Sequence, residues 1–248
     1  MENTIRGMRD RILLRHFVFW VLPTFVSAAL ALAYFSGMEP LRSIVAPQSN
    51  RELGVLEHLQ SFLLLATTVG GIIGFRNAGH RIEKAVSALV AAGGAILLLE
   101  EMDFGLHYWE LVFGETGLTN LNIHNQGEVL PVMKRASDAL TVVLFVVIPL
   151  VAWRVSDPRL RYFLPDRLTA LTVLGGLAVS LLAHALDDAR LYPAGPLSGN
   201  ISEFRETFTY YAMMLYGLDL ALLRKWPSHA AVASGEEAAP EPSMVRVR

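Results

Sequence analysis

The sequence contains no cysteine among its 248 residues. This absence excludes disulfide bonds, thiolate metal sites and cysteine nucleophiles together. Charged residues are also scarce, at 18% of the chain, whereas a soluble domain usually carries about 25%. No G-x-S-x-G run occurs, so a serine nucleophile held on a sharp strand-to-helix turn has no support.

Apolar residues take the place of the missing charge. They make up 53% of the chain, and its mean hydropathy is +0.40. They gather in blocks long enough to cross a bilayer, which takes about 20 residues per helix. The blocks cover residues 16–35, 53–75, 85–104, 137–155, 168–186 and 203–226. We therefore expect an all-α, polytopic membrane helix bundle of about six transmembrane helices, formed by residues 1–226.

The C-terminal residues 227–248 are rich in Ala, Pro, Ser and Glu. Such a segment has too little apolar surface to offset the entropy of ordering, so we expect a disordered tail.

Three details predict how the helices pack. Pro23 predicts a kink in the first helix, tolerable because neighbouring helices can satisfy the freed backbone groups. The small-xxx-small pair Gly70 and Gly74 predicts close helix packing. Asp219, near the end of the last block, is expected to extend toward Arg224, although a role in a proton pathway stays open.

Basic residues predict the orientation, because Lys and Arg concentrate on the cytoplasmic side. The N-terminal segment, the loops after the second and fourth blocks, and the C-terminal end together hold 15 of the 21 basic residues. An even number of helices with both termini inside (N-in/C-in) fits this distribution. The C-terminal tail is then cytoplasmic.

With this orientation, acids and histidines from several helices converge on the outer face. The set is Glu57, His58, Glu100, Glu101, Asp103, His107, His124, Asn125, Glu128, His184, Asp187, Asp188, Glu203 and Glu206. Carboxylates crowded in one layer repel each other, and a divalent cation or bound protons would relieve that repulsion. Alternatively, these acids are solvated at the interface or paired with Arg190 and Arg205.

Carboxylate and imidazole ligands without sulfur suit Zn, Fe or Mn, or Ca or Mg where histidines are fewer. Glu100 and Glu101 diverge by about 100° around a helix, so one of them is expected to point inward. The expected ligands are Glu100 or Glu101, His124, His184 and Asp188, with the catalytic candidates Glu203 and Glu206 as general base or further ligand.

These residues favour a metal-dependent hydrolase acting on a lipid or lipid-linked substrate at the outer leaflet. Phe104, Tyr108 and Trp109 would either seat an acyl chain or form an ordinary interfacial belt. Two alternatives stay open: an ion- or proton-coupled transporter, and a non-enzymatic subunit or sensor with a structural metal. Membrane lipid is the expected partner, nucleic acid is not expected, and protein partners stay open.

Two motifs carry a resemblance. The run EEMDFG at residues 100–105, followed by NIHNQGE at 122–128, resembles a motif pair in a functionally uncharacterised set of bacterial multi-pass membrane proteins. Those proteins also tend to have a Glu-x-x-Glu pair in the last helix, which Glu203 and Glu206 resemble. The chain departs from the set at Leu106, commonly Gln, and at Phe104, commonly Trp. The resemblance implies a bacterial inner membrane location.

A more distant similarity is to the multi-pass hydrolases that include alkaline ceramidases and adiponectin-receptor-like proteins. Those enzymes hold zinc with histidines and an acid at a membrane-embedded site. Their His-x-x-x-His pair in the last helix is missing from this sequence. The similarity is therefore an analogy of chemistry only.

Overall fold

The fold is given by a computed structural model that describes residues 13–45, 54–114, 116, 130–188, 201–222 and 224. In these ranges the chain forms helices and no strands. The all-α fold class predicted from the sequence is confirmed to that extent.

The helices follow the expected apolar blocks, with three short helices added between them. In chain order they are η1 (Phe17–Val21), α2 (Leu22–Phe35), α3 (Glu39–Val45), α4 (Val55–Asn77), α5 (Arg81–Glu101), η2 (Asp103–Gly105), α6 (Leu106–Phe113), α7 (Leu130–Val142), η3 (Val143–Val147), α8 (Ile148–Val151), η4 (Ala152–Arg154), α9 (Pro158–Phe163), α10 (Arg167–Asp188) and α11 (Ile201–Leu222).

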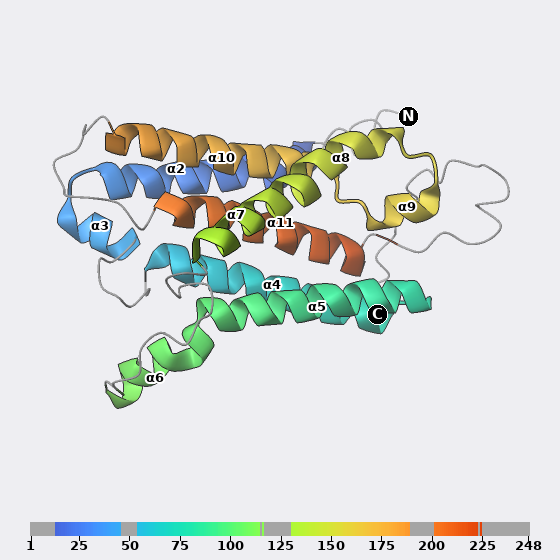
Figure 1. The fold of residues 1–248 in the computed structure, drawn as a ribbon, viewed down its shortest axis with the longest axis horizontal. Coiled ribbons are helices and arrows are strands. Elements are labelled where there is room, and N and C mark those ends of the chain that lie inside the picture. Colours follow the sequence, from blue (N-terminus) through green and yellow to red (C-terminus); the bar gives the residue numbers. More distant parts are fainter. Residues whose placement is uncertain are drawn as a thin grey trace.

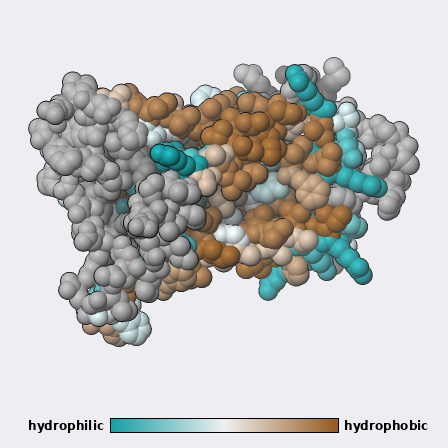
Figure 2. Space-filling model, viewed as in Figure 1, coloured by the Kyte–Doolittle hydropathy of each residue, from teal (hydrophilic) through white to brown (hydrophobic). Residues whose placement is uncertain are grey.

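Within the described ranges, four helical stretches are long and apolar enough to cross a membrane. They are Leu13–Phe35, Val55–Asn77, Arg81–Glu101 and Pro158–Leu182, and a shorter apolar helix covers Asp138–Val151. Large apolar side chains such as Phe25, Leu32 and Leu89 are exposed on these helices, and apolar surface dominates the flank seen in Figure 2. Polypeptide in a hydrocarbon environment exposes such side chains to lipid at no cost. The described helices therefore have the length, composition and exposed apolar surface that are typical of membrane spans.

The long helices lie side by side along the longest axis of the molecule (Figure 1). α4 packs against both α5 and α11, while α10 packs against α11, α2 and η3. α4 and α11 begin at the end of the bundle where α5 and α10 finish (Figure 1). We call this the acidic end, and the opposite one the basic end.

Small residues bring α4 into backbone contact with both of its neighbours. A Cβ added at Gly70 would lie 3.2 Å from the carbonyl carbon of Gly217 in α11, and one added at Gly71 would lie 2.5 Å from the Ala91 nitrogen in α5. A Cβ added at Gly74, one turn beyond Gly70, would lie 2.8 Å from the side-chain oxygen of Ser87 in α5. The close packing predicted from Gly70 and Gly74 is confirmed.

Pro23 disturbs the first helix, and two neighbours satisfy the carbonyl groups that it leaves free. Proline has no N–H to bond the carbonyl four residues earlier, which here is Phe19 O. Thr172 Oγ1 of α10 donates to this oxygen, and Tyr211 Oη of α11 donates to Val18 O at 2.7 Å. The backbone before Pro23 widens into the π-turn η1, as it does before Pro149 in η3. The predicted compensation by neighbouring helices is confirmed.

Basic residues are concentrated at one end of the bundle. Most of the Lys and Arg residues in the described ranges lie at the basic end, namely Arg15, Arg76, Arg81, Lys84, Arg154, Arg159, Arg161, Arg167 and Arg224. Asp219 also lies there, and its Oδ2 pairs with the Nη2 atom of Arg224 at 2.6 Å. The predicted contact between Asp219 and Arg224 is confirmed.

Candidate functional site

Three helices bring polar side chains together at the acidic end, where lipid-facing flanks give way to a buried hydrophilic group. We call Glu57 and Gln60 of α4, Glu101 of α5, and Glu203, Thr207 and Tyr210 of α11 the acidic-end cluster. Glu57 and Gln60 are three residues apart, and Glu203, Thr207 and Tyr210 recur at intervals of four and three. Such spacing places each set on one face of its helix.

Gln60 is the central contact between α4 and α11. Its side chain is fully buried. Its Nε2 atom donates to Glu203 O and Glu203 Oε2, both at 3.0 Å, and to Thr207 Oγ1 at 3.2 Å. The other amide atom, Oε1, is also buried and accepts no hydrogen bond from any described residue. Because both amide atoms are bonded to one carbon, this open acceptor lies within the acidic-end cluster.

Tyr210 links α11 to α5. Its hydroxyl donates to Glu101 Oε1 at 2.5 Å, and its ring is buried against Leu63 and Leu64. Of the two neighbouring acids of α5, Glu101 thus has its carboxylate directed toward α11 by this hydrogen bond. The leucines close the space beneath the acidic-end cluster with apolar side chains.

A left-handed turn follows Glu101. Asp103, Phe104 and Gly105 have φ values of 47°, 54° and 87°, a region that side chains other than glycine adopt at a cost of about 1–3 kcal/mol. The turn buries Asp103 completely and leaves Phe104 half exposed. It ends α5 and redirects the chain into α6. Strained backbone of this kind is concentrated at functional sites.

The short helix α6 extends away from the bundle at the acidic end (Figure 1). Trp109 and Phe113 are 56% and 69% exposed and pack ring against ring, with centroids 4.4 Å apart. Tyr108 points back, and its hydroxyl lies 3.2 Å from Nδ1 of His58 on α4. The helix therefore presents an aromatic surface beside the acidic-end cluster.

The remaining predicted site residues are only partly described. Glu57 is buried at 6% exposure in the first turn of α4, and Glu100 and Glu206 are half-buried on α5 and α11. His107 lies on α6, and His184, Asp187 and Asp188 lie in the last two turns of α10, but their side chains fall outside the described part. His124, Asn125 and Glu128 lie outside the described residues altogether.

Pairing with basic residues was the alternative expectation for these acids. Arg205 forms its ion pair with Asp138 of α7, Nε to Oδ1 at 3.2 Å. Asp138 is outside the predicted set, so within the described residues Arg205 does not neutralise the acidic-end cluster. Arg190 lies outside those residues.

The site residues predicted from the sequence did not include Gln60, Thr207 and Tyr210. Helical spacing was the signal that could have found them, since Gln60 follows Glu57 by one turn and Thr207 follows Glu203 by one turn. A polar side chain repeated on one face of an apolar helix indicates a shared polar environment.

Among the described side chains, no group of three or more His, Asp and Glu residues is placed to hold a metal ion. The described part supplies carboxylates from three helices and the Gln60 oxygen acceptor, which are hard oxygen ligands. No protein-family model, curated protein or solved structure matches the chain.

Proposed function

We propose that the chain crosses the membrane six times, with both termini in the cytoplasm and the acidic end on the outer face. In the part of the chain that the structure describes, four helices have the length and apolar character of spans. α11 runs lengthwise beside these four, and the stretch from α7 to α8 crosses the bundle obliquely from one end toward the other (Figure 1). The gathering of Lys and Arg at the basic end supports the orientation, because that end is then cytoplasmic. We place the protein in a bacterial inner membrane on the resemblance alone.

We further propose that the acidic end binds a divalent metal, Zn, Fe or Mn, and hydrolyses a lipid or lipid-linked substrate at the outer leaflet. The observation that carries this proposal is the acidic-end cluster itself. Carboxylates from α4, α5 and α11 share one layer with a buried, open oxygen acceptor on Gln60. Buried acids inside a membrane bundle are costly and usually functional. The proposed ligands are Glu101, His124, His184 and Asp188, with Glu100 as the alternative to Glu101.

Glu101 fits the ligand role better than Glu100 because Tyr210 directs its carboxylate toward α11. Glu203 fits the role of general base because its Oε2 atom accepts the Gln60 N–H. That hydrogen bond fixes the carboxylate in one orientation, facing α4. When bound, the metal would supply an activated water, because coordination lowers the pKa of water to about 7. Glu206, one turn after Glu203, is the second candidate for the base.

A lipid substrate suits the surroundings of the acidic-end cluster. The exposed rings of Phe104, Trp109 and Phe113 lie on the turn and helix that follow Glu101. Aromatic side chains of this kind favour the membrane interface, where one side is apolar and the other is wet. An acyl chain resting on these rings would present its polar end to the acids.

A proton- or ion-coupled transporter is the second candidate, favoured by the hydrogen bond between Tyr210 and Glu101. The packing beneath the acidic-end cluster supports hydrolysis over transport. Leu63 and Leu64 pack directly below the acidic-end cluster. About three turns after Gln60 along α4, the backbones of Gly70 and Gly217 are in contact. A site that opens on one side of the membrane is sufficient for an enzyme, whereas a carrier needs access from both.

The test is metal content per chain in protein purified in detergent without chelator, for the wild type and three variants. Glu101→Gln and His184→Ala remove proposed ligands. Asp138→Asn is the matched control, because it removes an acid at the same end that pairs with Arg205. We expect near-stoichiometric Zn, Fe or Mn in the wild type and the control, and loss of the metal in the two ligand variants.

Metal-loaded protein should then release a water-soluble product from lipid vesicles, and Glu203→Gln should abolish the release while keeping the metal. Thermal unfolding of each variant separates loss of the site from loss of the fold. A metal-free wild type, or equal metal in all four proteins, would sink the metalloenzyme proposal.

A further inference from the structure

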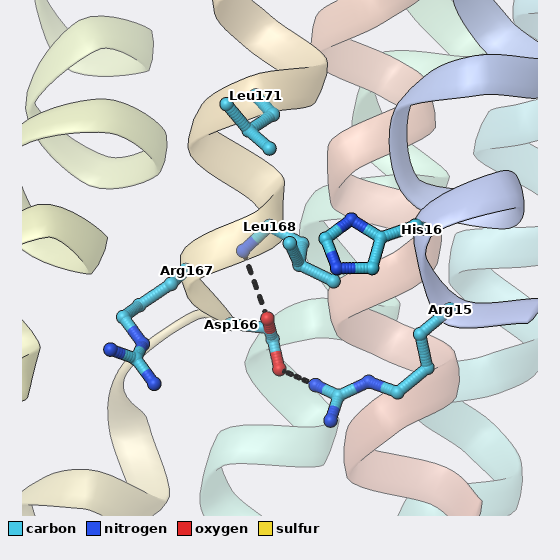
Figure 3. A pocket seen from close by; sticks show the side chains of 6 residues that line it. All are labelled: Arg15, His16, Asp166, Arg167, Leu168 and Leu171. Atoms are coloured by element: carbon cyan, nitrogen blue, oxygen red, sulfur yellow. Dashed lines mark hydrogen bonds and ion pairs between the residues drawn. The ribbon is translucent and has the colours of Figure 1, made fainter. Parts of the chain in front are cut away.

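The basic end contains a cavity that the proposed hydrolysis does not use. It lies between the start of the first helix and the start of α10, has a volume of about 390 Å³, and is lined by Arg15, His16, Asp166, Arg167, Leu168 and Leu171 (Figure 3). Cationic and apolar side chains therefore face the same space. This combination suits a ligand that is charged at one end and apolar at the other.

Asp166 organises the polar wall. Its Oδ1 atom accepts the N–H of Leu168 at 2.9 Å and so caps the first turn of α10. Its Oδ2 atom pairs with Arg15 from the first helix (Figure 3). Both carboxylate oxygens are therefore engaged, and the guanidinium of Arg15 is held at the cavity with further N–H groups available.

Two more donors line the cavity. The indole N–H of Trp20 donates to Nδ1 of His16 at 3.2 Å, which places the imidazole proton of neutral His16 on Nε2. The side chain of Arg167 is exposed, and it forms no ion pair or hydrogen bond with any residue that the structure describes. Arg15, His16 and Arg167 can thus each donate to an anion in the cavity.

The charge balance selects the kind of ligand. Two arginines against one aspartate leave one net positive charge at neutral pH, which matches a phosphodiester with a single negative charge. A zwitterionic headgroup would bring its ammonium group close to these arginines and be disfavoured. Leu168 and Leu171 continue the wall onto the apolar flank of α10, where Leu171 is 43% exposed.

We propose that this cavity binds an anionic phospholipid, with the headgroup phosphate between Arg15, His16 and Arg167 and an acyl chain along Leu168 and Leu171. Basic pockets between membrane helices recognise lipid headgroups in this way. The orientation proposed above puts the lipid in the inner leaflet, but binding itself does not depend on that orientation. It is also independent of any metal at the acidic end.

The experiment counts lipids bound to the full chain by native mass spectrometry in detergent. Phosphatidylglycerol and phosphatidylcholine with identical acyl chains are titrated separately, and glycerol 3-phosphate serves as the soluble phosphate. The variants are Arg167→Gln and Arg15→Gln. Arg76→Gln is the matched control, because it removes the same charge from the same end, on α4 and away from the cavity.

We expect one tightly bound phosphatidylglycerol and about tenfold weaker binding after loss of either cavity arginine, as for a lost charge-assisted hydrogen bond. Arg167→Lys, which keeps the charge, should recover part of the affinity. Arg76→Gln should stay within about twofold of the wild type, as expected for distant, screened charges. Glycerol 3-phosphate should not displace the lipid at equal concentration.

Three results would overturn the proposal. Equal binding of the two lipids would remove the selection for negative charge. Equal losses in Arg76→Gln and Arg167→Gln would reduce the effect to the general charge of the basic end. Displacement by equimolar glycerol 3-phosphate would make the cavity a site for a soluble phosphate. Thermal unfolding of Arg15→Gln is compared with that of Arg167→Gln. A lower Tm in Arg15→Gln alone would identify the part of its binding loss that comes from breaking the ion pair with Asp166.

Discussion

The contact between α4 and α5 predicts opposite results for the same substitution at two glycines. A Cβ at Gly71 would lie 2.5 Å from the nitrogen and 2.8 Å from the Cα of Ala91, both backbone atoms that cannot rotate away. Overpacking of this kind costs about 1–3 kcal/mol, whereas replacing glycine by alanine in a helix favours folding by about 0.5–1 kcal/mol. The net effect of Gly71→Ala is a loss of up to about 2 kcal/mol.

Gly93 on α5 provides the matched control, because a Cβ there meets nothing within 4 Å. Only the gain from replacing glycine by alanine in a helix applies there, so Gly93→Ala should stabilise the protein. For a chain of this size 1 kcal/mol corresponds to about 2–4 °C in Tm. We therefore expect Gly71→Ala to lower Tm by up to about 8 °C and Gly93→Ala to raise it by about 1–4 °C.

The assay is thermal unfolding in one detergent, followed by far-UV circular dichroism. It compares the two variants with the wild type at matched protein concentration. If Gly71→Ala melted with or above Gly93→Ala, α4 and α5 would not be in backbone contact at Ala91, and the arrangement around α4 would be wrong.

Two further predictions concern the backbone. Thr172→Val removes the donor to Phe19 O and should destabilise the protein by about 1–3 kcal/mol, the cost of an unsatisfied buried carbonyl. In a Pro23→Ala background the alanine N–H can bond that oxygen, so a double-mutant cycle of thermal melts should show coupling between the two substitutions. Additive effects would contradict this role of Thr172. Gly105→Ala has open space around the new Cβ but a φ of 87°, so its cost should be purely conformational, about 1–2 kcal/mol. Gly105→Asn should cost less. Equal melting temperatures for the wild type and both variants would contradict the left-handed turn.

Apolar block length predicted which segments are helical, because a bilayer-spanning helix needs a continuous apolar run that can be counted. The described residues of each expected block are mostly helical. The effects of Pro23 and Gly70 were also predictable from the sequence. Proline lacks an N–H and glycine lacks a Cβ in any surroundings. The short helices α3, α6 and α9 were not predicted, because their few residues carry no membrane-length signal.

The candidate site was predictable as a layer but not as a set of contacts. Glu57, Glu101 and Glu203 were placed at one end of the bundle by helix direction alone. The sequence could not choose between Glu100 and Glu101, because that choice depends on how α5 is rotated against α11. Nor did it indicate the left-handed turn at Asp103 and Phe104, because phenylalanine seldom takes a positive φ and aspartate does so only occasionally.

The close packing of α4 also determines how the acidic-end cluster is built. Gly70 and Gly217 allow the backbones of α4 and α11 to touch, and both helices continue without interruption to the acidic end. Gln60 can therefore reach a main-chain carbonyl and a carboxylate of the same residue, Glu203, from the neighbouring helix. A site held on rigid, closely packed helices keeps its polar atoms in one geometry more tightly than a site on loops. Substitutions that force α4 and α11 apart should consequently impair the acidic-end cluster even when they lie several turns away from it.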